Sequence, residues 1–310
     1  MKILLLGANG QLGRTFLHDG RLAARGTLVA ASRDGTLVDG GAGVVGDLAT
    51  PDALVELLER EQPEVIVNAA AFTAVDRAEQ EEENATLING AAIGAIGTWA
   101  ASHGALVVHY STDYVFAGDA TSPYAEDAAV APAGAYGRSK LAGERALRAS
   151  GAPHFIFRTA WVYSTVGNNF LRTMLRLGTE RDELRVVADQ QGTPTDTTLI
   201  VDGTFAAIDR WLASRADRKV IEGTYHLTAS GSTSWHGFAK ALLEGAAARG
   251  LLTRSPLVHP ISTTDFPTPA KRPAYSVLDN GRFMRTFGVE LPEWQTGMDR
   301  TLNALSHSSD

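Results

Sequence analysis

The N-terminal stretch KILLLGANGQLG, residues 2–13, constrains the fold of this chain more than any other feature. The apolar run Ile3–Leu6 predicts a short buried strand, the glycines predict a tight turn, and the pattern from Gln11 onward predicts a helix. A helix that begins at a glycine turn offers free N–H groups and the positive end of its dipole to a phosphate group. The stretch therefore predicts a pyrophosphate-binding turn at the start of a βαβ unit. The residues expected to line this turn are Gly7, Asn9, Gly10, Gln11, Leu12 and Gly13.

Apolar strands and helical segments alternate along the first half of the chain. Strands are predicted at residues 27–32, 64–71, 105–112 and 153–163, and helices at 51–62, at 84–102 and from Tyr136 onward. Each strand is almost wholly apolar, which is typical of a parallel sheet with both faces covered by helices. We therefore predict an α/β fold with a Rossmann-type, doubly wound parallel sheet, and assign residues 1–162 to a dinucleotide-binding domain.

Strands and helices no longer alternate regularly after Val162. Residues 167–178 and 196–215 have helical patterns, but the Pro-rich stretch 264–273 and an isolated strand in GTYHLTAS, residues 223–230, interrupt them. This change predicts a smaller C-terminal lobe, residues 163–310, that mainly binds the substrate. Some of its helices are expected to pack back on the sheet.

Composition limits the kinds of partner. The chain has 28 Lys and Arg residues against 35 Asp and Glu residues, for a net charge of −7, and it has no basic block. A nucleic-acid partner is therefore not expected. The absence of cysteine excludes disulfides and thiolate metal sites. No segment reaches the ~18 apolar residues of a membrane span, and the N-terminal apolar run is too short for a signal peptide, so we predict a cytoplasmic protein that does not contact a membrane.

The end of the second strand normally contacts the adenosine ribose of a bound dinucleotide. Here that strand ends in Ser32 and Arg33. A hydroxyl and a guanidinium suit a 2′-phosphate, so NADP(H) is favoured over NAD(H). The alternative, in which Arg33 faces solvent and either nucleotide binds, remains open. Further cofactor contacts are expected at Asp47, Leu48, Ala71, Phe72 and Thr73.

A candidate proton donor lies in AYGRSKLAGE, residues 135–144, where Tyr136 and Lys140 share one helix face at i and i+4. A free tyrosine is a poor acid at neutral pH, and a neighbouring ammonium lowers its pKa toward the working range. Ser111 and Thr112 end the strand at 105–112 and Asp113 follows it, at the edge of the sheet where ligands bind. Either Ser111 or Thr112 could supply a second hydroxyl. The alternative, an ordinary surface pair of Tyr136 and Lys140, becomes less plausible beside the glycine turn.

Five motifs together carry a resemblance to a known family: GANGQLG, NAAAFTAVDRAE, STDYVF, YGRSKLAGE and RTAWVYS. The sequence resembles the extended short-chain dehydrogenase/reductase superfamily and, within it, the dTDP-4-dehydrorhamnose reductases. The similarity covers nearly the whole chain. It implies that NADPH, or NADH, delivers a hydride to the C4 carbonyl carbon of dTDP-4-dehydro-6-deoxy-L-mannose, which gives dTDP-L-rhamnose.

The resemblance also implies roles for individual residues. Tyr136 would donate a proton to the developing alkoxide, and Thr112 would hydrogen-bond the same oxygen. Lys140 would tune Tyr136 and hold the nicotinamide ribose, and Tyr110 would lie near the nicotinamide. The residues expected to touch the sugar are Thr112, Asp113 and Trp161.

Two other functions are compatible with the same motifs. A sugar-nucleotide epimerase or dehydratase would hold NAD tightly, but the related dehydratases have an Asp-Glu pair where this chain has Asp113 followed by Tyr114. A non-catalytic NADP-binding regulatory subunit, similar to the β subunit of methionine adenosyltransferase, would keep the motifs without turnover. A homodimer remains open. Some related reductases share a divalent metal between glutamates of two subunits, but Thr15 and Thr198 stand at the matching positions, so no metal site is predicted.

Overall fold

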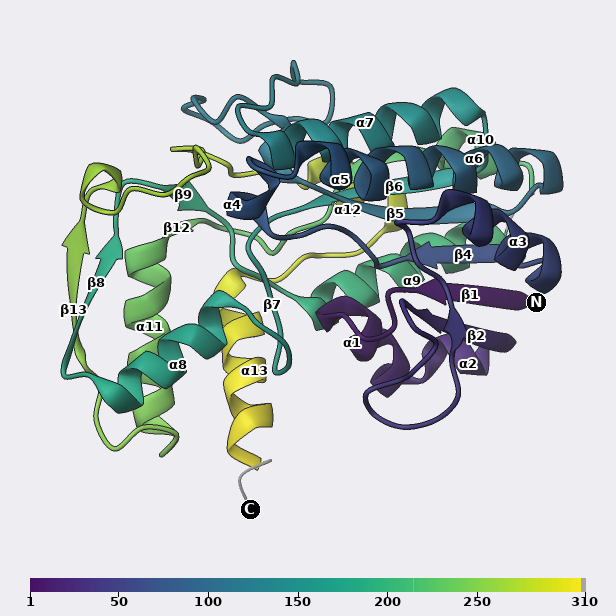
Figure 1. Ribbon diagram of the computed structural model, residues 1–310. Helices are drawn as coiled ribbons and strands as arrows, with labels where there is room; N and C mark the ends of the chain where they lie inside the picture. The colour runs from purple at the N-terminus through teal and green to yellow at the C-terminus, as the bar shows by residue number, and fades with distance from the viewer. Residues whose placement is uncertain (214, 308–310) are drawn as a thin grey trace.

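A seven-stranded parallel sheet forms the centre of the molecule in the computed structural model, which describes residues 1–213 and 215–307 (Figure 1). All its pairings are parallel. In spatial order its strands are β11 (Gly223–His226), β6 (His154–Thr159), β5 (Leu106–Thr112), β4 (Val65–Asn68), β1 (Lys2–Leu6), β2 (Thr27–Ser32) and β3 (Val44–Val45). The chain runs from β1 toward one edge and from β4 toward the other. The carboxyl ends of β1 and β4 therefore flank the switch point at which ligands bind in such sheets.

Helices cover both faces of the sheet, which confirms the predicted doubly wound fold (Figure 1). Side chains of β1 alternate between two cores: Ile3 and Leu5 face one, and Leu4 and Leu6 face the other. The first core is covered by α1 (Gln11–Asp19), α2 (Arg21–Ala24) and α9 (Thr197–Ala213). The second is covered by α3 (Pro51–Glu61), α6 (Ala92–His103) and α7 (Ala135–Ser150).

The long helix predicted at residues 84–102 is present but is not uniform. It consists of α5 (Glu82–Thr86), a π-helical turn (Leu87–Ala91) and α6. The π turn lies against α7, where a Cβ on Gly143 would overlap the carbonyl oxygen of Asn89. Such turns often occur at functional sites. The short helix α4 (Val75–Ala78) precedes this region.

The rest of the chain forms a group of short strand pairs and helices beside the carboxyl edge of the sheet (Figure 1). The strands pair as β7 (Val162–Tyr163) with β10 (Thr195–Asp196), β8 (Glu183–Val187) with β13 (Leu257–Ile261), and β9 (Gln191–Gly192) with β12 (Thr233–Ser234). The helices of this group are α8 (Phe170–Glu180), α11 (Trp235–Ala248) and α13 (Trp294–His307). Two shorter helices lie by the central sheet instead: α10 (Arg218–Ile221) precedes the amino end of β11, and α12 (Gly281–Phe287) packs against β11. Single 3₁₀ turns occur at Asp113–Val115 and Thr263–Asp265. Within the described residues, no helix is both long and apolar enough to cross a membrane.

One expectation about the C-terminal half differs from the structure. The strand in GTYHLTAS is not isolated, because β11 pairs with β6 as an edge strand of the central sheet. Tyr225 and His226 of β11 are fully buried there, so the pairing is part of the core. The helix α9 likewise packs against α1. The division of the chain into two domains between residues 162 and 163 stays a prediction. The second segment contributes the strand β11 to the sheet and the helix α9 to the cover of one of its faces.

Candidate active site

The predicted site residues converge at the carboxyl edge of the sheet. The glycine turn follows β1, the segment from Ala69 to Ala74 follows β4, and Thr112 ends β5. Parallel pairing places Leu6 beside Asn68, and Asn68 beside His109. The helix α7 packs beside β5 and brings Tyr136 to the same edge.

The three glycines of the turn have different roles. Gly7 has a φ of +78°, which favours glycine, and a Cβ there would also overlap the backbone at Ala70. A Cβ on Gly13 would overlap the carbonyl oxygen of Gly7, so Gly13 is required for the helix to pack on the turn. A Cβ on Gly10 would come no closer than 3.3 Å to Gly7. No side chain caps α1, and its first turn has no acidic residue. These features leave an open helix N-terminus suited to a pyrophosphate.

The side chains of Asn9 and Gln11 are engaged within the protein. Asn9 donates to the carbonyl of Thr36 at 2.7 Å and accepts from the N–H of Val38 at 3.0 Å. Gln11 accepts from Asn169 at 2.7 Å. The Asn9 side chain is therefore engaged through both its nitrogen and its oxygen, and the Gln11 side chain through its oxygen. Leu12 packs against the core.

At the end of β2, the two predicted ribose contacts, Ser32 and Arg33, differ in their exposure to solvent. Ser32 is buried, and its hydroxyl donates to the carbonyl of Thr36 at 2.8 Å. Arg33 is exposed and makes no ion pair with another described residue. Asp47 accepts from the N–H of Ala49 at 3.0 Å, and Leu48 beside it is buried. Arg33 is thus the side chain at this strand end that is free to meet a phosphate.

The loop after β4 is held by a residue that the sequence analysis did not single out. Asn89, in the π turn, accepts from the N–H of Phe72 at 2.9 Å and donates to its carbonyl at 3.0 Å. It also contacts the hydroxyl of Ser139 on α7 at 2.9 Å. Ala71 and Thr73 are the chain neighbours of Phe72, whose backbone Asn89 holds in place. The sequence signal for Asn89 was a lone amide in an apolar helical pattern.

Thr112, Asp113 and Tyr136 lie together. The Thr112 hydroxyl donates to Asp113 Oδ1 at 2.9 Å and accepts from the N–H of Tyr114 at 3.2 Å. Burial raises the pKa of Asp113 to about 6, although hydroxyls of Ser276 and Thr112 oppose this rise. Burial and the nearby Asp113 raise the pKa of Tyr136, while a hydrogen bond with Thr112 lowers it. The phenol therefore stays protonated and adjoins a hydroxyl and a carboxyl.

Lys140 is buried beneath this group. Its Nζ donates to the carbonyl of Tyr110 at 2.6 Å and lies 3.4 Å from Nε2 of His109. Burial lowers the pKa of Lys140 to about 8, and the charge of Glu144 opposes this shift. The pKa of Tyr136 shows no contribution from Lys140 in this structure, so the tuning of Tyr136 by Lys140 stays a prediction.

Tyr110 faces away from the edge of the sheet. Its ring packs against Phe16 and Phe157, and its hydroxyl is 2.8 Å from that of Thr204 on α9. The part of Tyr110 that contacts Lys140 is the backbone carbonyl. Its placement near the nicotinamide stays a prediction.

Trp161 adopts a backbone conformation that is rare for a residue with a side chain, with φ of +46°. Its indole stacks on that of Trp235, with ring centroids 3.5 Å apart and planes 5° apart. A Cβ on Gly192 would overlap the same ring. Trp235 and Gly192 therefore fix the orientation of Trp161 after β6.

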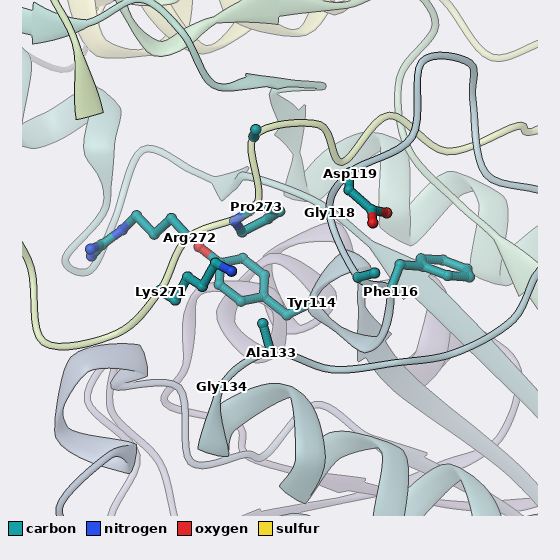
Figure 2. A pocket seen from close by; sticks show the side chains of 11 residues that line it. Tyr114, Phe116, Gly118, Asp119, Ala133, Gly134, Lys271, Arg272 and Pro273 are labelled. Atoms are coloured by element: carbon teal, nitrogen blue, oxygen red, sulfur yellow. The ribbon is translucent and has the colours of Figure 1, made fainter. Parts of the chain in front are cut away.

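A cavity of about 210 Å³ is lined in part by Tyr114, a neighbour of Tyr136 (Figure 2). It lies between the segment from Tyr114 to Asp119, the residues before α7 and the segment from Lys271 to Ala274. The rings of Tyr114 and Tyr136 pack edge to face, with their centroids 5.7 Å apart. Figure 2 shows Arg272 extending away from Tyr114, and its guanidinium donates to Asp76 at 2.9 Å.

No described group of three or more His, Asp or Glu side chains could hold a metal ion. Thr15, where a metal-bridging glutamate would stand, donates to the hydroxyl of Thr197 at 2.8 Å.

Comparison with known proteins agrees with this geometry. The family model described as "RmlD substrate binding domain" matches residues 1–307. A Burkholderia thailandensis protein named dTDP-4-dehydrorhamnose reductase is 45% identical over 299 residues, covering 95% of this chain and 96% of the relative. The protein of that name from Escherichia coli K12 is 44% identical over 305 residues, covering 98% of each. The chain belongs to the dTDP-4-dehydrorhamnose reductase family.

Solved structures of dTDP-4-dehydrorhamnose reductases have the same fold. The Clostridium acetobutylicum protein superimposes with a TM-score of 0.85 at 36% identity, covering 98% of this chain and 99% of that one. The Bacillus anthracis protein, described as a complex with NADP, gives a TM-score of 0.84 at 32% identity with the same coverage.

Proposed function

We infer that this chain is an NADPH-dependent dTDP-4-dehydrorhamnose reductase, with NADH as the alternative donor. It reduces the C4 ketone of dTDP-4-dehydro-6-deoxy-L-mannose to give dTDP-L-rhamnose. The observation that carries this proposal is the meeting of Tyr136, Thr112 and Asp113 at the carboxyl end of β5, on the same edge of the sheet as the open glycine turn. Membership of the family and the shared activity of its named relatives support the same reaction.

The chain has the features needed to hold a dinucleotide. The open N-terminus of α1 suits the pyrophosphate, since its N-cap is Gly10 and its first turn has no acidic residue. Arg33 suits a 2′-phosphate, and a relative at 32% identity is described with NADP. When bound, the reduced nicotinamide supplies the hydride. Lys140 and the backbone of the loop around Phe72 would hold the nicotinamide end.

The protein's own groups handle the proton and the developing charge. Tyr136 donates its phenolic proton to the ketone oxygen as that oxygen becomes an alkoxide. Thr112 donates a hydrogen bond to the same oxygen, for which its hydroxyl must turn away from Asp113. Asp113 and Trp161 would bind the hydroxyls and the ring of the sugar.

The remaining expectations follow from the same reaction. The partner is a soluble nucleotide sugar, which supports a cytoplasmic location. Any homodimer would form without a bridging metal, because the Thr15 hydroxyl is uncharged and already bonded to Thr197.

A direct assay tests the reaction. Purified protein is mixed with the 4-keto sugar nucleotide and either NADPH or NADH, and loss of the reduced nicotinamide absorbance is followed. We expect net consumption, with deuterium from labelled NADPH at C4 of dTDP-L-rhamnose. Tightly bound NAD⁺ with no net consumption would instead support an epimerase or dehydratase. NADP binding without turnover would support a regulatory subunit.

A further inference from the structure

A chain of buried polar groups ends at Lys140, and its other members have no role in the reaction described above. It links Asn68 at the end of β4, His109 in β5 and Lys140 in α7. The exposed fractions of these residues are 1%, 1% and 2%. Buried polar side chains are costly unless each hydrogen bond is satisfied, so the positions of the hydrogens matter.

The orientation of Asn68 can be worked out from its backbone neighbour. The N–H of Ala70 can only donate, and it lies 3.2 Å from Oδ1 of Asn68. This contact places the amide NH₂ of Asn68 toward Nδ1 of His109, at 3.1 Å. Nδ1 must therefore accept a hydrogen bond. A neutral imidazole that accepts at Nδ1 carries its hydrogen on Nε2.

The Nε2–H of His109 then points toward the amine of Lys140, 3.4 Å away. An ammonium group has only hydrogens to present, whereas a neutral amine has a lone pair that can accept this N–H. Burial and the charge of Lys140 hold the pKa of His109 well below its usual range, so the imidazole stays neutral. The carbonyl of Tyr110 can accept from either form of Lys140.

We propose that His109, in the tautomer selected by Asn68, is a positioning residue that presents an N–H to Lys140 and thereby favours its uncharged form. The role rests on the proposed function, in which Lys140 acts next to the proton donor. With a pKa of about 8, Lys140 is still mainly the ammonium near neutral pH, and the N–H of His109 lowers the pH at which this ammonium is lost.

The other groups around Lys140 act in different directions. Glu144, one turn further along α7, favours the ammonium. Its influence is reduced because Glu144 is also bonded to Arg158 of β6 and Ser111 of β5. With burial, the net result is the pKa of about 8 for Lys140. Among the residues that the structure describes, His109 is the titratable side chain within hydrogen-bonding distance of the amine.

Two substitutions replace the N–H that faces Lys140 with a hydrogen-bond acceptor. In Asn68→Asp, the carboxylate accepts from Nδ1–H, so Nε2 of His109 becomes an acceptor for the ammonium. In His109→Gln, the amide oxygen can accept from Lys140 directly. Each change should raise the pKa of Lys140, by about one unit. His154→Gln is the matched control, because His154 is bonded to the carbonyl of Ala152 at the far end of β6.

Nuclear magnetic resonance tests the tautomer and the lysine without relying on activity. Nitrogen-15 spectra of the full chain should show the proton of His109 on Nε2, and titration of labelled lysine is practical because the chain has five lysines. A proton on Nδ1, or the same Lys140 pKa in wild type, Asn68→Asp and His109→Gln, would overturn the proposal.

The pH profile of kcat supplies the second readout. The alkaline limb should move upward by about one pH unit in both variants and stay in place in His154→Gln. If wild type turns over but the limb moves in neither variant, the inference is wrong while the proposed function stands. If wild type does not turn over at all, the proposed function fails, and the spectra still decide the tautomer.

Discussion

Tyr136 is the residue through which the proposed chemistry can be tested most directly. Phenylalanine in its place keeps the ring packed against Tyr114 but removes the proton that the ketone oxygen requires. We expect Tyr136→Phe to lower kcat by roughly 10²- to 10⁴-fold, measured as NADPH consumption. The affinity for NADPH, measured by titration, should change little.

Tyr114→Phe is the matched control for this prediction. Tyr114 is a neighbouring, partly buried phenol, but no role in the reaction is assigned to its hydroxyl. The control should keep most of the activity. An equal loss in both variants would contradict the assignment of Tyr136 as the proton donor.

Asp113 illustrates a cost to stability at the same site. Its pKa in the folded protein, about 6, lies above the ordinary value of 3.8. Its contribution to stability is therefore full below pH 3.8 and is lost as the pH rises through 6. Asp113→Asn, which removes the buried charge, should stabilise the free protein at pH 7 by about 1–3 kcal/mol and abolish most activity.

Thermal unfolding at two pH values checks this prediction. The gain in melting temperature for Asp113→Asn should be clear at pH 7 and about half as large at pH 5, because the folded wild-type carboxyl is then mostly protonated. A variant that melts below wild type at pH 7 would show that hydrogen bonds to the ionised carboxylate outweigh the cost of its burial.

At the scale of an element, the glycine turn and α1 offer a matched pair. A Cβ on Gly13 would overlap the backbone of Gly7, whereas a Cβ on Gly10 would make a close contact of 3.3 Å with the Gly7 carbonyl oxygen without overlapping it. We expect Gly13→Ala to destabilise the protein without cofactor by about 1–3 kcal/mol, measured by urea unfolding. Gly10→Ala should leave that stability nearly unchanged and weaken NADPH binding, because the methyl group would occupy the space for the pyrophosphate. Equal losses of stability in both variants would contradict the separate roles.

The elements of the first half could be predicted because their signals are local. Apolar runs at β1, β4 and β5 give buried strands, and the glycine turn needs no distant partner to be recognised. The π turn around Asn89 could not be predicted, since it depends on contacts with Phe72 and with α7. The place of β11 in the sheet likewise depends on pairing with β6, which lies far away in the sequence.

In the candidate site, too, local sequence motifs predicted some features, whereas features that depend on distant contacts were not predicted. The motifs predicted that Thr112 and Tyr136 belong to one site, and in the structure a hydrogen bond with Thr112 lowers the pKa of Tyr136. They did not predict that the side chains of Asn9 and Gln11 are held by other parts of the protein, nor that His109 faces Lys140. These features depend on the orientation of side chains from segments far apart in the chain, which no short pattern encodes.

On the scale of the whole molecule, the two halves of the chain share one core. Its largest group of buried apolar side chains joins residues of β1, β5 and α1 with residues of α9, α11 and α13. Gln11 at the start of α1 is also bonded to Asn169, just before α8. The fold therefore predicts that the two halves unfold together, in one cooperative transition.

Truncation after residue 162 tests this prediction. The shortened chain would lose α9, which covers α1 and one face of the sheet, and β11, which covers the edge of β6. An uncovered apolar face and an open strand edge favour aggregation over folding. We expect chain 1–162 to show no cooperative thermal transition and no NADPH binding, with the full chain measured alongside. If the fragment melts cooperatively and NADPH raises its midpoint, the boundary at residue 162 separates a domain that folds alone, and the shared core is not required for the cofactor site.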